Sequence, residues 1–359
     1  MSVVTEPSVL AIGHSNYGAT RIEQLLGDTV RPERPPSGWR GMVVAGTAVI
    51  RSRARILYLA DIGMSTTVAA ALGRLTGKRV IVDTGDAVFA LTRSVGDRPI
   101  WQLALVGIGE QVALRSAHHI VVRGRAHAEI VPRPATHVPD LPPPDAQPLP
   151  RDTLRRQLGI DDVFVVGLVG SLNFAPRLQT TYGWDLIEAL RLTPPNVVAL
   201  IVGDGTGLEF LRNRAGALGV SSRCRFVGRV AFDEVGQYVS AMDGAISTQT
   251  NDLVGHVRTT GKLPLYLAYG CPVIASHVGE AARILGPLGW TQPYYGVVDR
   301  SYPSRLAIAI EQWSNDPCGA SRRRHLALKL AREIFDADTM RLRIADLIAT
   351  LDKTTRRTP

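Results

Sequence analysis

The stretch GAISTQTNDLVGHVRTTGKLPLYLAYGCPVIAS, residues 244–276, decides the fold class of this chain. It opens with a short apolar run, Gly244–Ser247, passes through a polar loop, and enters a segment with helical periodicity at 259–270. A second apolar run follows at 272–276. Two short buried strands separated by one helix form a βαβ unit, which places both strands in a parallel sheet.

The same alternation extends over most of the chain on both sides of this stretch. We expect further strands at 9–13, 56–59, 79–83, 119–123, 164–169, 197–202 and 225–227. We expect helices at 65–76, 99–117, 124–130, 152–158, 182–192, 207–218, 232–240, 302–315, 322–335 and 340–351. The pattern predicts an α/β protein with two Rossmann-like, doubly wound domains and right-handed crossovers.

A proline-rich stretch separates the two series of strands. Eight prolines fall between Pro132 and Pro150, and such a stretch cannot continue a helix or a central strand. It therefore reads as an extended linker. We expect an N-terminal domain over 1–140, a linker over 141–151, a C-terminal domain over 152–318, and helices over 319–359 that pack back on the N-terminal domain.

The composition is that of a globular protein with two domains. The chain has 359 residues, 45% of them hydrophobic and 20% charged, and domains usually hold about 100–200 residues. Its three cysteines, Cys224, Cys271 and Cys318, are far apart in the sequence, which favours a reducing compartment. The first seven residues lack the basic start of a signal peptide, so we expect a cytoplasmic protein.

The net charge of +9 has two interpretations. Only four of the 41 basic residues are lysines, so arginine-rich codon usage explains much of the charge. Alternatively, the charge serves an anionic partner, such as nucleotide phosphates or the inner face of an anionic membrane, which the basic surface and the C-terminal arginines would contact. The densest basic cluster, 322–324, is too short to indicate a nucleic-acid surface, and we expect no nucleic acid.

Two glycine-containing loops follow strands of the second half. Gly170 and Ser171 come directly after the strand at 164–169, where glycine lets a ligand approach the backbone. Arg177 follows in the same loop and could reach a phosphate; the alternative is a plain turn. Gly203 and Gly205 come after the strand at 197–202, but Leu stands at 208 and the dinucleotide fingerprint is incomplete.

The polar loop of the opening stretch is the strongest candidate site. We expect Thr259 and Thr260 to cap the helix, and free backbone N–H groups, Arg258 and Lys262 to form an anion site. The alternative is an ordinary solvated helix start. The loop does not match a phosphate-binding P-loop. The candidate residues of this loop are Asp252, His256, Arg258, Thr259, Thr260, Gly261 and Lys262.

In the first half, Asp83 and Asp86 follow the strand at 79–83 and could bind sugar hydroxyls or act as a base. Asp also favours turns for local reasons, which is the competing interpretation. His118 and His119 lie at a helix–strand junction without further ligands nearby in the sequence, so a structural role is favoured over metal binding. We expect no metal and no cofactor.

These pieces together resemble the nucleotide-sugar glycosyltransferases of the GT-B fold, and most closely retaining family 4. The most specific piece is 270–276, GCPVIAS, followed by VGEA at 278–281. The resemblance covers 163–312, whereas the first half matches only in architecture. It implies two facing domains, a donor bound by the C-terminal one, an acceptor bound by the N-terminal one, and a role in polysaccharide or glycoconjugate biosynthesis.

The resemblance also implies roles for individual residues. Gly170 and Ser171 would lie beside the donor diphosphate, Arg258 to Lys262 would hold phosphate and sugar, and Asp83 or Asp86 would orient or deprotonate the acceptor hydroxyl. The segment near the nucleobase would be Gly228, Arg229 and Val230.

The chain departs from the family at its donor motif. The family usually has two Glu residues eight apart, and those positions hold Val257 and Leu265 here. The Lys that normally follows the Gly170 loop is replaced by Tyr182. We expect Arg258 and Lys262 to replace the missing positive charge. We expect the missing carboxylate to be replaced by Asp252 or Glu280.

The leading hypothesis is therefore a retaining, metal-independent transferase that moves a sugar from a nucleotide-diphosphate donor to an unknown acceptor. The alternatives are a sugar-nucleotide epimerase or phosphorylase, a non-catalytic or donor-divergent binding protein, and a nicotinamide-dependent oxidoreductase. The incomplete fingerprint at Gly203 speaks against the last of these.

Overall fold

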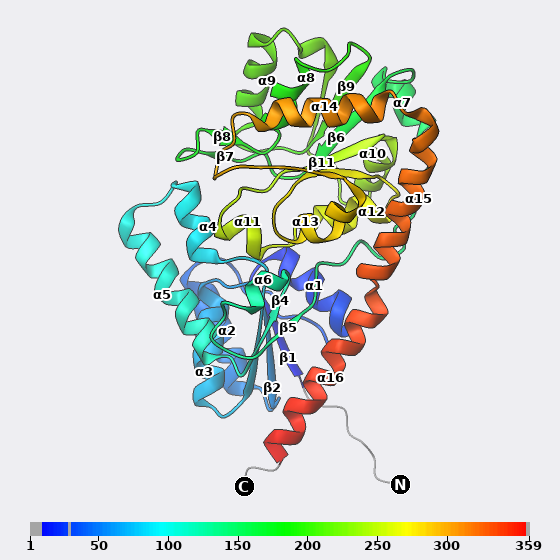
Figure 1. The fold of residues 1–359 in the computed structure, drawn as a ribbon. Helices are drawn as coiled ribbons and strands as arrows, with labels where there is room; N and C mark the ends of the chain where they lie inside the picture. Colours follow the sequence, from blue (N-terminus) through cyan, green and yellow to red (C-terminus); the bar gives the residue numbers. More distant parts are fainter. Residues whose placement is uncertain (1–8, 28–29, 357–359) are drawn as a thin grey trace, which may run out of the picture. The chain divides into compact units, whose positions relative to one another are not determined.

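The computed structural model describes residues 9–27 and 30–356, which fall into two compact units (Figure 1). Unit 1 holds Met1–Arg93, Arg98–Leu141 and Asp336–Pro359, and unit 2 holds Ser94–Asp97 and Pro142–Phe335. The polar start at 1–7, from which a signal peptide was not expected, lies outside the described residues. Each unit contains a parallel sheet, which confirms the predicted α/β class.

Unit 1 is built on a five-stranded parallel sheet in the order β1-β2-β3-β4-β5. Its strands are nearly all apolar because helices cover both faces. The strands are β1 (Val9–Gly13), β2 (Ile56–Ala60), β3 (Arg79–Thr84), β4 (His119–Val122) and β5 (Ala135–His137). The helices are α1 (Asn16–Leu26), α2 (Trp39–Arg51), α3 (Met64–Leu75), α4 (Val88–Val95), α5 (Ile100–Ser116), α6 (Arg125–Ala128) and α16 (Ala337–Arg356).

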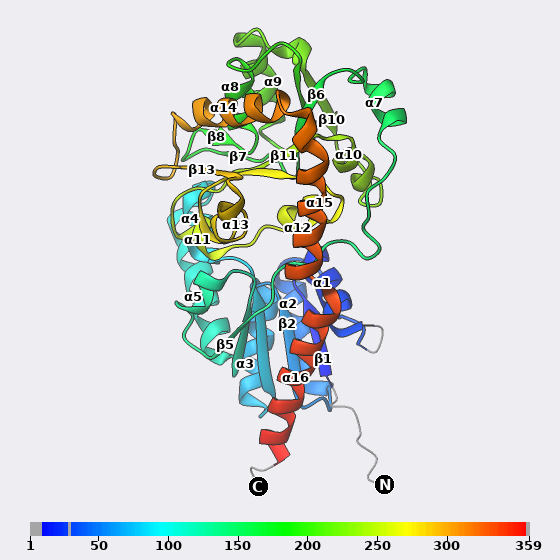
Figure 2. The ribbon, with the colours of Figure 1, turned by 45° about the vertical axis from the view of Figure 1, so that its right-hand side comes forward.

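The strand order of this sheet never reverses, which corrects the expectation of a doubly wound sheet in the first half. The crossover helices α2, α3 and α5 all pack on one face. The opposite face is covered by α1 and by α16, which lies beside α1 (Figure 2). The C-terminal helix of the chain therefore completes the core of unit 1.

Besides α4, three elements of unit 1 were not expected from the sequence. The first is α1, which lies between the expected strands at 9–13 and 56–59, where no helix was expected; the Ser15 side chain caps it by accepting a hydrogen bond from the Gly18 N–H. The second is α2, an apolar segment flanked by prolines and glycine. The third is β5, inside the stretch read as a linker; as an edge strand, it tolerates Pro134 beside it, whose carbonyl accepts from Ile120.

Unit 2 is built on a six-stranded sheet in the order β10-β9-β6-β11-β12-β13, with a separate hairpin β7-β8. Starting from β6, the chain first builds outward to one side and then returns to build the other, so this sheet is doubly wound as predicted. The strands are β6 (Phe164–Val169), β7 (Phe174–Ala175), β8 (Thr180–Thr181), β9 (Val197–Val202), β10 (Cys224–Gly228), β11 (Gly244–Ser247), β12 (Val273–Ser276) and β13 (Thr291–Gln292).

The helices of unit 2 agree with the predicted series to within a few residues, except α11 and α13, which were not expected. They are α7 (Asp152–Leu158), α8 (Trp184–Leu190), α9 (Leu208–Ala217), α10 (Val235–Ala241), α11 (Leu253–Val257), α12 (Lys262–Ala268), α13 (Gly279–Leu285), α14 (Tyr302–Ser314) and α15 (Pro317–Ile334). Of the two last helices of the chain, α15 packs on α12 in unit 2.

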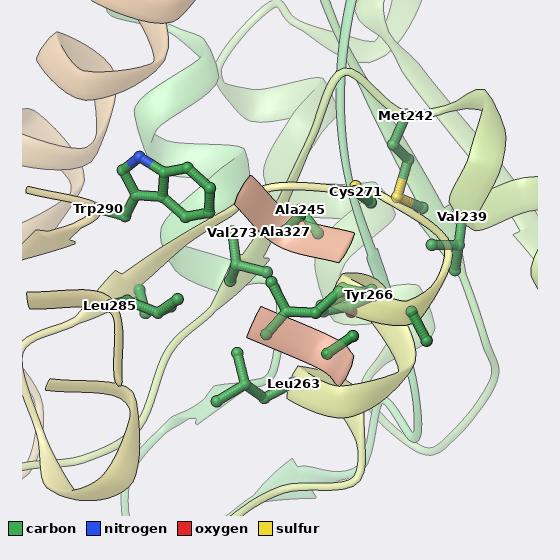
Figure 3. Close-up of a cluster of buried hydrophobic side chains, with 14 of the residues drawn as sticks. Val239, Met242, Ala245, Leu263, Tyr266, Cys271, Val273, Leu285, Trp290 and Ala327 are labelled. Atoms are coloured by element: carbon green, nitrogen blue, oxygen red, sulfur yellow. The ribbon is translucent and has the colours of Figure 1, made fainter. Parts of the chain in front are cut away.

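The opening stretch of the sequence forms the centre of the unit 2 core. Figure 3 shows Leu263 and Tyr266 of α12 among buried side chains from β11 and β12. Both residues are almost fully buried, which anchors the first turn of α12 and therefore the position of Lys262 at its start. Among the helices of 9–27 and 30–356, none combines the length and hydropathy that a membrane span requires.

Candidate functional site

Strands β6 and β11 diverge at the point where the strand order of the unit 2 sheet reverses, and we call the region at their carboxyl ends the crevice. The two strands pair only near the start of β11, at Gly244 with Val166 and Ala245 with Gly167. Beyond that point, two tyrosine hydroxyls form hydrogen bonds with backbone groups of β6 and β11. Tyr266 Oη accepts from the Val169 N–H, and Tyr182 Oη donates to the Ile246 carbonyl, each at 2.7 Å. Open α/β sheets bind their ligands at such a switch point.

The side chain of Lys262 enters this crevice. Its Nζ lies 3.7 Å from the centroid of the Tyr182 ring. Burial, reinforced by the nearby Arg258 guanidinium, lowers the pKa of Lys262 to about 7. No carboxylate of the described residues lies close enough to pair with this ammonium. An unpaired amine at a ligand-binding edge favours an anionic ligand, because an anion would supply the missing counter-charge.

The predicted glycine loops lie against this lysine. Gly170 has φ +145°, and a Cβ there would stand 2.5 Å from Lys262 Cε, so glycine is required beside the lysine stem. The Gly170 N–H donates to the Val202 carbonyl, and the Gly203 N–H donates to the Gly228 carbonyl. These hydrogen bonds hold the loops after β6, β9 and β10 side by side.

The remaining loop residues surround the crevice less closely. Gly205 packs against the backbone of Leu172, and Ser171 is exposed beside Gly170. After β10, Arg229 is exposed and Val230 is partly buried against the core.

A small cavity next to Lys262 joins several other predicted residues. It is lined by Arg258, Thr259, Thr260 and Glu280, together with residues of β11 and α13. Glu280 is buried, and its carboxylate is held by Arg283 at 2.6 Å. The cavity therefore brings the predicted basic loop to the carboxyl ends of β11 and β12.

The comparisons with known proteins agree with this geometry. Residues 163–316 match the family model described as Glycosyl transferases group 1. Across 96% of its length the chain is similar to HepE from Anabaena, crystallised with UDP and glucose, with a TM-score of 0.75, 18% identity and 100% of HepE covered. It is likewise similar to sucrose-phosphate synthase from Thermosynechococcus elongatus, with a TM-score of 0.76, 16% identity, and 97% and 100% of the two chains covered.

The chain has the GT-B fold, and its residues 163–316 resemble the group 1 glycosyltransferases. A glycosyltransferase from Rickettsia africae shares the fold at a TM-score of 0.66 and 12% identity, with 97% and 99% of the chains covered. No curated protein sequence matches the chain at a significant level. The resemblance to the GT-B fold seen in the sequence is confirmed, whereas membership of family 4 stays a prediction.

The expectation that threonines cap the helix of the predicted loop is wrong. Neither Thr259 nor Thr260 caps α12, whose N-cap is Gly261 without any side-chain hydrogen bond. The helix starts later than predicted because Pro264 fits only a first turn, where its missing N–H costs nothing.

The acidic and imidazole side chains of the predicted loop are engaged locally. Asp252 caps α11 by accepting from the Gly255 N–H at 3.1 Å and from the Thr250 hydroxyl at 2.7 Å. His256 Nε2 lies 2.8 Å from Asn251 Oδ1. With Glu280 paired to Arg283, the two proposed substitutes for the missing Glu pair both have structural partners.

Arg177 is placed differently from the prediction. It lies in the turn of the β7–β8 hairpin, where its N–H donates to the Val95 carbonyl and its Cβ packs at Gly96. The positions of the absent Glu pair are apolar for a structural reason: Val257 is fully buried and Leu265 packs against the core. The positive charge of the site therefore comes from the start of α12, not from the hairpin.

One buried carboxyl of this unit was missed by the sequence reasoning. Burial raises the pKa of Asp185, at the start of α8, to about 7, and its Oδ1 accepts no hydrogen bond from the described residues. Its neighbours by charge are Asp299 and Arg300. The available signal was an acidic residue in the first turn of the helix WDLIEAL, whose other residues apart from Glu188 are apolar.

In unit 1, Asp83 lies at the predicted end of β3, but its side chain is fully buried. Its Oδ2 accepts from Arg21 Nε at 2.7 Å and from Tyr58 Oη at 2.6 Å, while Arg123 lies 3.5 Å from its Oδ1. A group without exposure cannot contact an acceptor hydroxyl. The prediction of a direct catalytic role for Asp83 is therefore corrected to a structural one.

Asp86 lies three residues further on and is partly exposed beside His127 and Glu110. A second carboxylate at this edge, Asp61, was not predicted. Burial would raise its pKa, but Arg123 at 2.6 Å and the Ser15 hydroxyl outweigh burial and lower it. In the part of the chain that the structure describes, no three His, Cys, Asp or Glu side chains gather as a metal site.

Proposed function

We propose that this protein transfers a sugar from a nucleotide-diphosphate donor whose phosphates bind in the crevice between β6 and β11. The observation that carries the proposal is the Lys262 ammonium, which lies at the switch point of the sheet without a carboxylate partner among the described residues. Such a cation is costly to keep in the free protein, and a bound diphosphate would offset that cost.

The same cation suits the chemistry of the transfer step. When the bond between sugar and diphosphate breaks, negative charge grows on the leaving phosphate oxygen. Lys262 and Arg258, which interact electrostatically at the start of α12, would stabilise that charge. Gly170 allows the phosphates to approach the backbone. Gly228, Arg229 and Val230 are the proposed contacts of the nucleobase.

Tyr182 explains how the family pattern is replaced. The resemblance places a lysine at this position. Here the position holds Tyr182, and its ring contacts the ammonium of Lys262, which is the first residue of α12. The positive charge would thus be delivered to the same place by α12. This arrangement supports the earlier hypothesis that Lys262 substitutes for the missing charge.

We propose further that the reaction retains the anomeric configuration and needs no divalent metal, since protein cations would neutralise the leaving group. Activity should survive chelation by EDTA, and proton NMR of the first product formed should show the donor's anomeric configuration. Loss of turnover in EDTA that Mg²⁺ or Mn²⁺ restores would contradict the metal-independent part. Inversion of configuration would contradict the other part.

The test is a titration of the purified full chain with nucleotide donors by calorimetry. HepE binds UDP and UDP-glucose in its crystal structures, so UDP-glucose is the first probe, followed by GDP-, ADP- and dTDP-sugars. The Lys262→Met variant should weaken binding of the preferred donor at least tenfold, a loss of about 1.4 kcal/mol or more. Lys329→Met is the matched control, because Lys329 is exposed on α15.

If Lys262→Met and the parent protein bind the preferred donor with equal affinity, the proposed role of Lys262 is contradicted. Absence of binding to every nucleotide sugar would instead overturn the donor class, and the binding-protein alternative would then replace the transferase.

A further inference from the structure

The outer surface of α5 in unit 1 is apolar where a surface helix is normally polar. Trp101, Leu105, Ile108 and Val112 lie four, three and four residues apart, a spacing that puts them on one helical face. They are 63%, 59%, 61% and 37% exposed. We call these four residues the α5 stripe. Contiguous exposed apolar surface of this kind marks a binding surface.

The only acidic residue of α5 points the other way. Glu110 is buried, and its carboxylate accepts hydrogen bonds from the backbone N–H groups of Val88 and Phe89 at the start of α4. The Glu110 carboxylate thus forms its hydrogen bonds inside the unit, whereas the side chains of the α5 stripe are exposed. Core packing therefore does not explain the α5 stripe.

A second helix of the same layer also carries exposed apolar side chains. The layer that covers this face of the sheet consists of α2, α3 and α5, with α3 in contact with both of the others. On α2, Trp39, Val43 and Ile50 are also largely exposed, at 66%, 57% and 64%. Tryptophan at the rim of an apolar surface is typical of proteins that lie in a membrane interface.

The charges of this layer all have one sign at the surface. The three helices hold four arginines, Arg40, Arg51, Arg74 and Arg115, against the single buried Glu110. Arg74 and Arg115 line an open groove together with Ile108 and Val112 of the α5 stripe. Neither guanidinium pairs with a carboxylate of the described residues. A groove with apolar walls and two cations fits an anionic lipid headgroup and its adjoining chain.

We propose that unit 1 docks on an anionic lipid bilayer through the α5 stripe, with Arg74 and Arg115 holding lipid phosphates. The sequence expectation of a membrane contact rested on overall charge and C-terminal arginines; the structure points to α5 instead. A second copy of the chain fits this face less well, because pairing the two layers would bring arginines against arginines. The proposal does not depend on sugar transfer, since vesicle binding requires neither donor nor acceptor.

The experiment is flotation of the full chain with two kinds of vesicle, pure phosphatidylcholine and phosphatidylcholine with 30% phosphatidylglycerol. The parent protein should float with the anionic vesicles, and the L105Q/I108Q variant should show a partition coefficient at least tenfold lower. The R74Q/R115Q variant should lose roughly tenfold and show a weaker dependence on salt. Leu342→Gln is the matched control, since Leu342 is 66% exposed on α16, on the other face of the sheet.

Thermal unfolding and light scattering accompany the flotation. All substituted residues are exposed, so the variants should unfold at the parent temperature. The proposal is overturned if the parent protein does not float with anionic vesicles, or if L105Q/I108Q floats as well as the parent. It is also overturned if light scattering shows a parent dimer that L105Q/I108Q turns into a monomer while vesicle binding is absent.

Discussion

The carboxyl ends of the strands in units 1 and 2 use charge in opposite ways. In unit 1, Arg21 and Arg123 are surrounded by three carboxylates, Asp61, Asp83 and Asp140, at 2.6 to 3.5 Å. In unit 2, the Lys262 ammonium faces an aromatic ring and has no carboxylate beside it among the described residues. The first group is complete in itself, whereas the second lacks a counter-charge.

The difference teaches how to separate structural from functional charge in this protein. A buried network whose members satisfy one another holds loops in place, and breaking it costs stability. A buried cation without a counter-charge lowers the stability of the free protein, and a ligand that supplies the counter-charge raises that stability. Substitutions in the two groups should therefore change different observables.

The largest effect is expected from Asp83→Asn in unit 1. It removes a fully buried charge that holds Arg21 and lies near Arg123, so unit 1 should lose about 3–5 kcal/mol of stability. Urea unfolding followed by circular dichroism measures the change. Asp346→Asn, on the exposed part of α16, should leave the transition in place. A shift no larger than that of the control would remove the structural role of Asp83.

The next effect concerns the close approach of Gly170 to Lys262. Gly170→Ala places a methyl group 2.5 Å from Lys262 Cε at φ +145°, which costs about 1–3 kcal/mol in backbone strain alone. Because the lysine stem must also move, donor affinity measured by calorimetry should fall at least tenfold. Gly219→Ala is the control: it also has positive φ, but its Cβ would meet open space. Unchanged donor affinity in Gly170→Ala would contradict the assigned crevice.

The pH dependence of donor binding follows from the pKa of Lys262, about 7 in the free protein. The ammonium is present below pH 7 and lost above it, so affinity for a nucleotide sugar should fall as pH rises from 6 to 9, by at most tenfold per unit. Burial raises the pKa values of Tyr182 and Tyr266, so neither ring titrates in this window. Lys262→Arg should flatten the profile; a parent profile that is already flat would refute the assignment.

The lowered pKa of Lys262 also predicts how the stability of the protein depends on pH. Because the pKa of Lys262 is lower in the folded state than the usual value of about 10.4, the unfolded chain binds more protons between pH 7 and 10. The free energy of unfolding should therefore rise with pH across that window. Lys262→Met should lack this rise and melt a few degrees above the parent at pH 7, roughly 2–4 °C. A lower melting temperature would show that Lys262 serves the fold.

The smallest effect is expected from the aromatic support of Lys262. Tyr182→Phe keeps the ring but loses the hydrogen bond to Ile246, whereas Tyr182→Leu loses both. A cation–aromatic contact contributes about 0.5–1 kcal/mol, so at pH 7 Tyr182→Leu should bind donor about two- to fivefold more weakly than Tyr182→Phe. Tyr295→Leu removes a comparable contact with Arg305 elsewhere and should leave donor binding unchanged. Equal affinity of the two Tyr182 variants would show that the ring does not support the ammonium.

Much of unit 2 and its site could be predicted from local patterns. Strands β6, β9 and β11 begin and end at the expected residues, because uniformly apolar runs between polar loops are a strong signal. The loops with Gly170 and Gly203 were found because each follows such a strand, whereas Gly228 was named from the family resemblance. Unit 1 was harder: α1, α2 and β5 were missed since their signals compete with loop-forming residues nearby.

The sequence by itself determined the α/β class, the two units and the glycosyltransferase resemblance, and it singled out Lys262 as a candidate, since all of these rest on residues close together in the chain. Only the tertiary structure decided which charges are satisfied. Asp83 accepts a hydrogen bond from Arg21, which is 62 residues away in the sequence. Lys262 contacts the ring of Tyr182, which is also distant in the sequence, near the point where the strand order of unit 2 reverses. A residue's neighbours in space set its exposure and its pKa, and spacing along the chain does not report them.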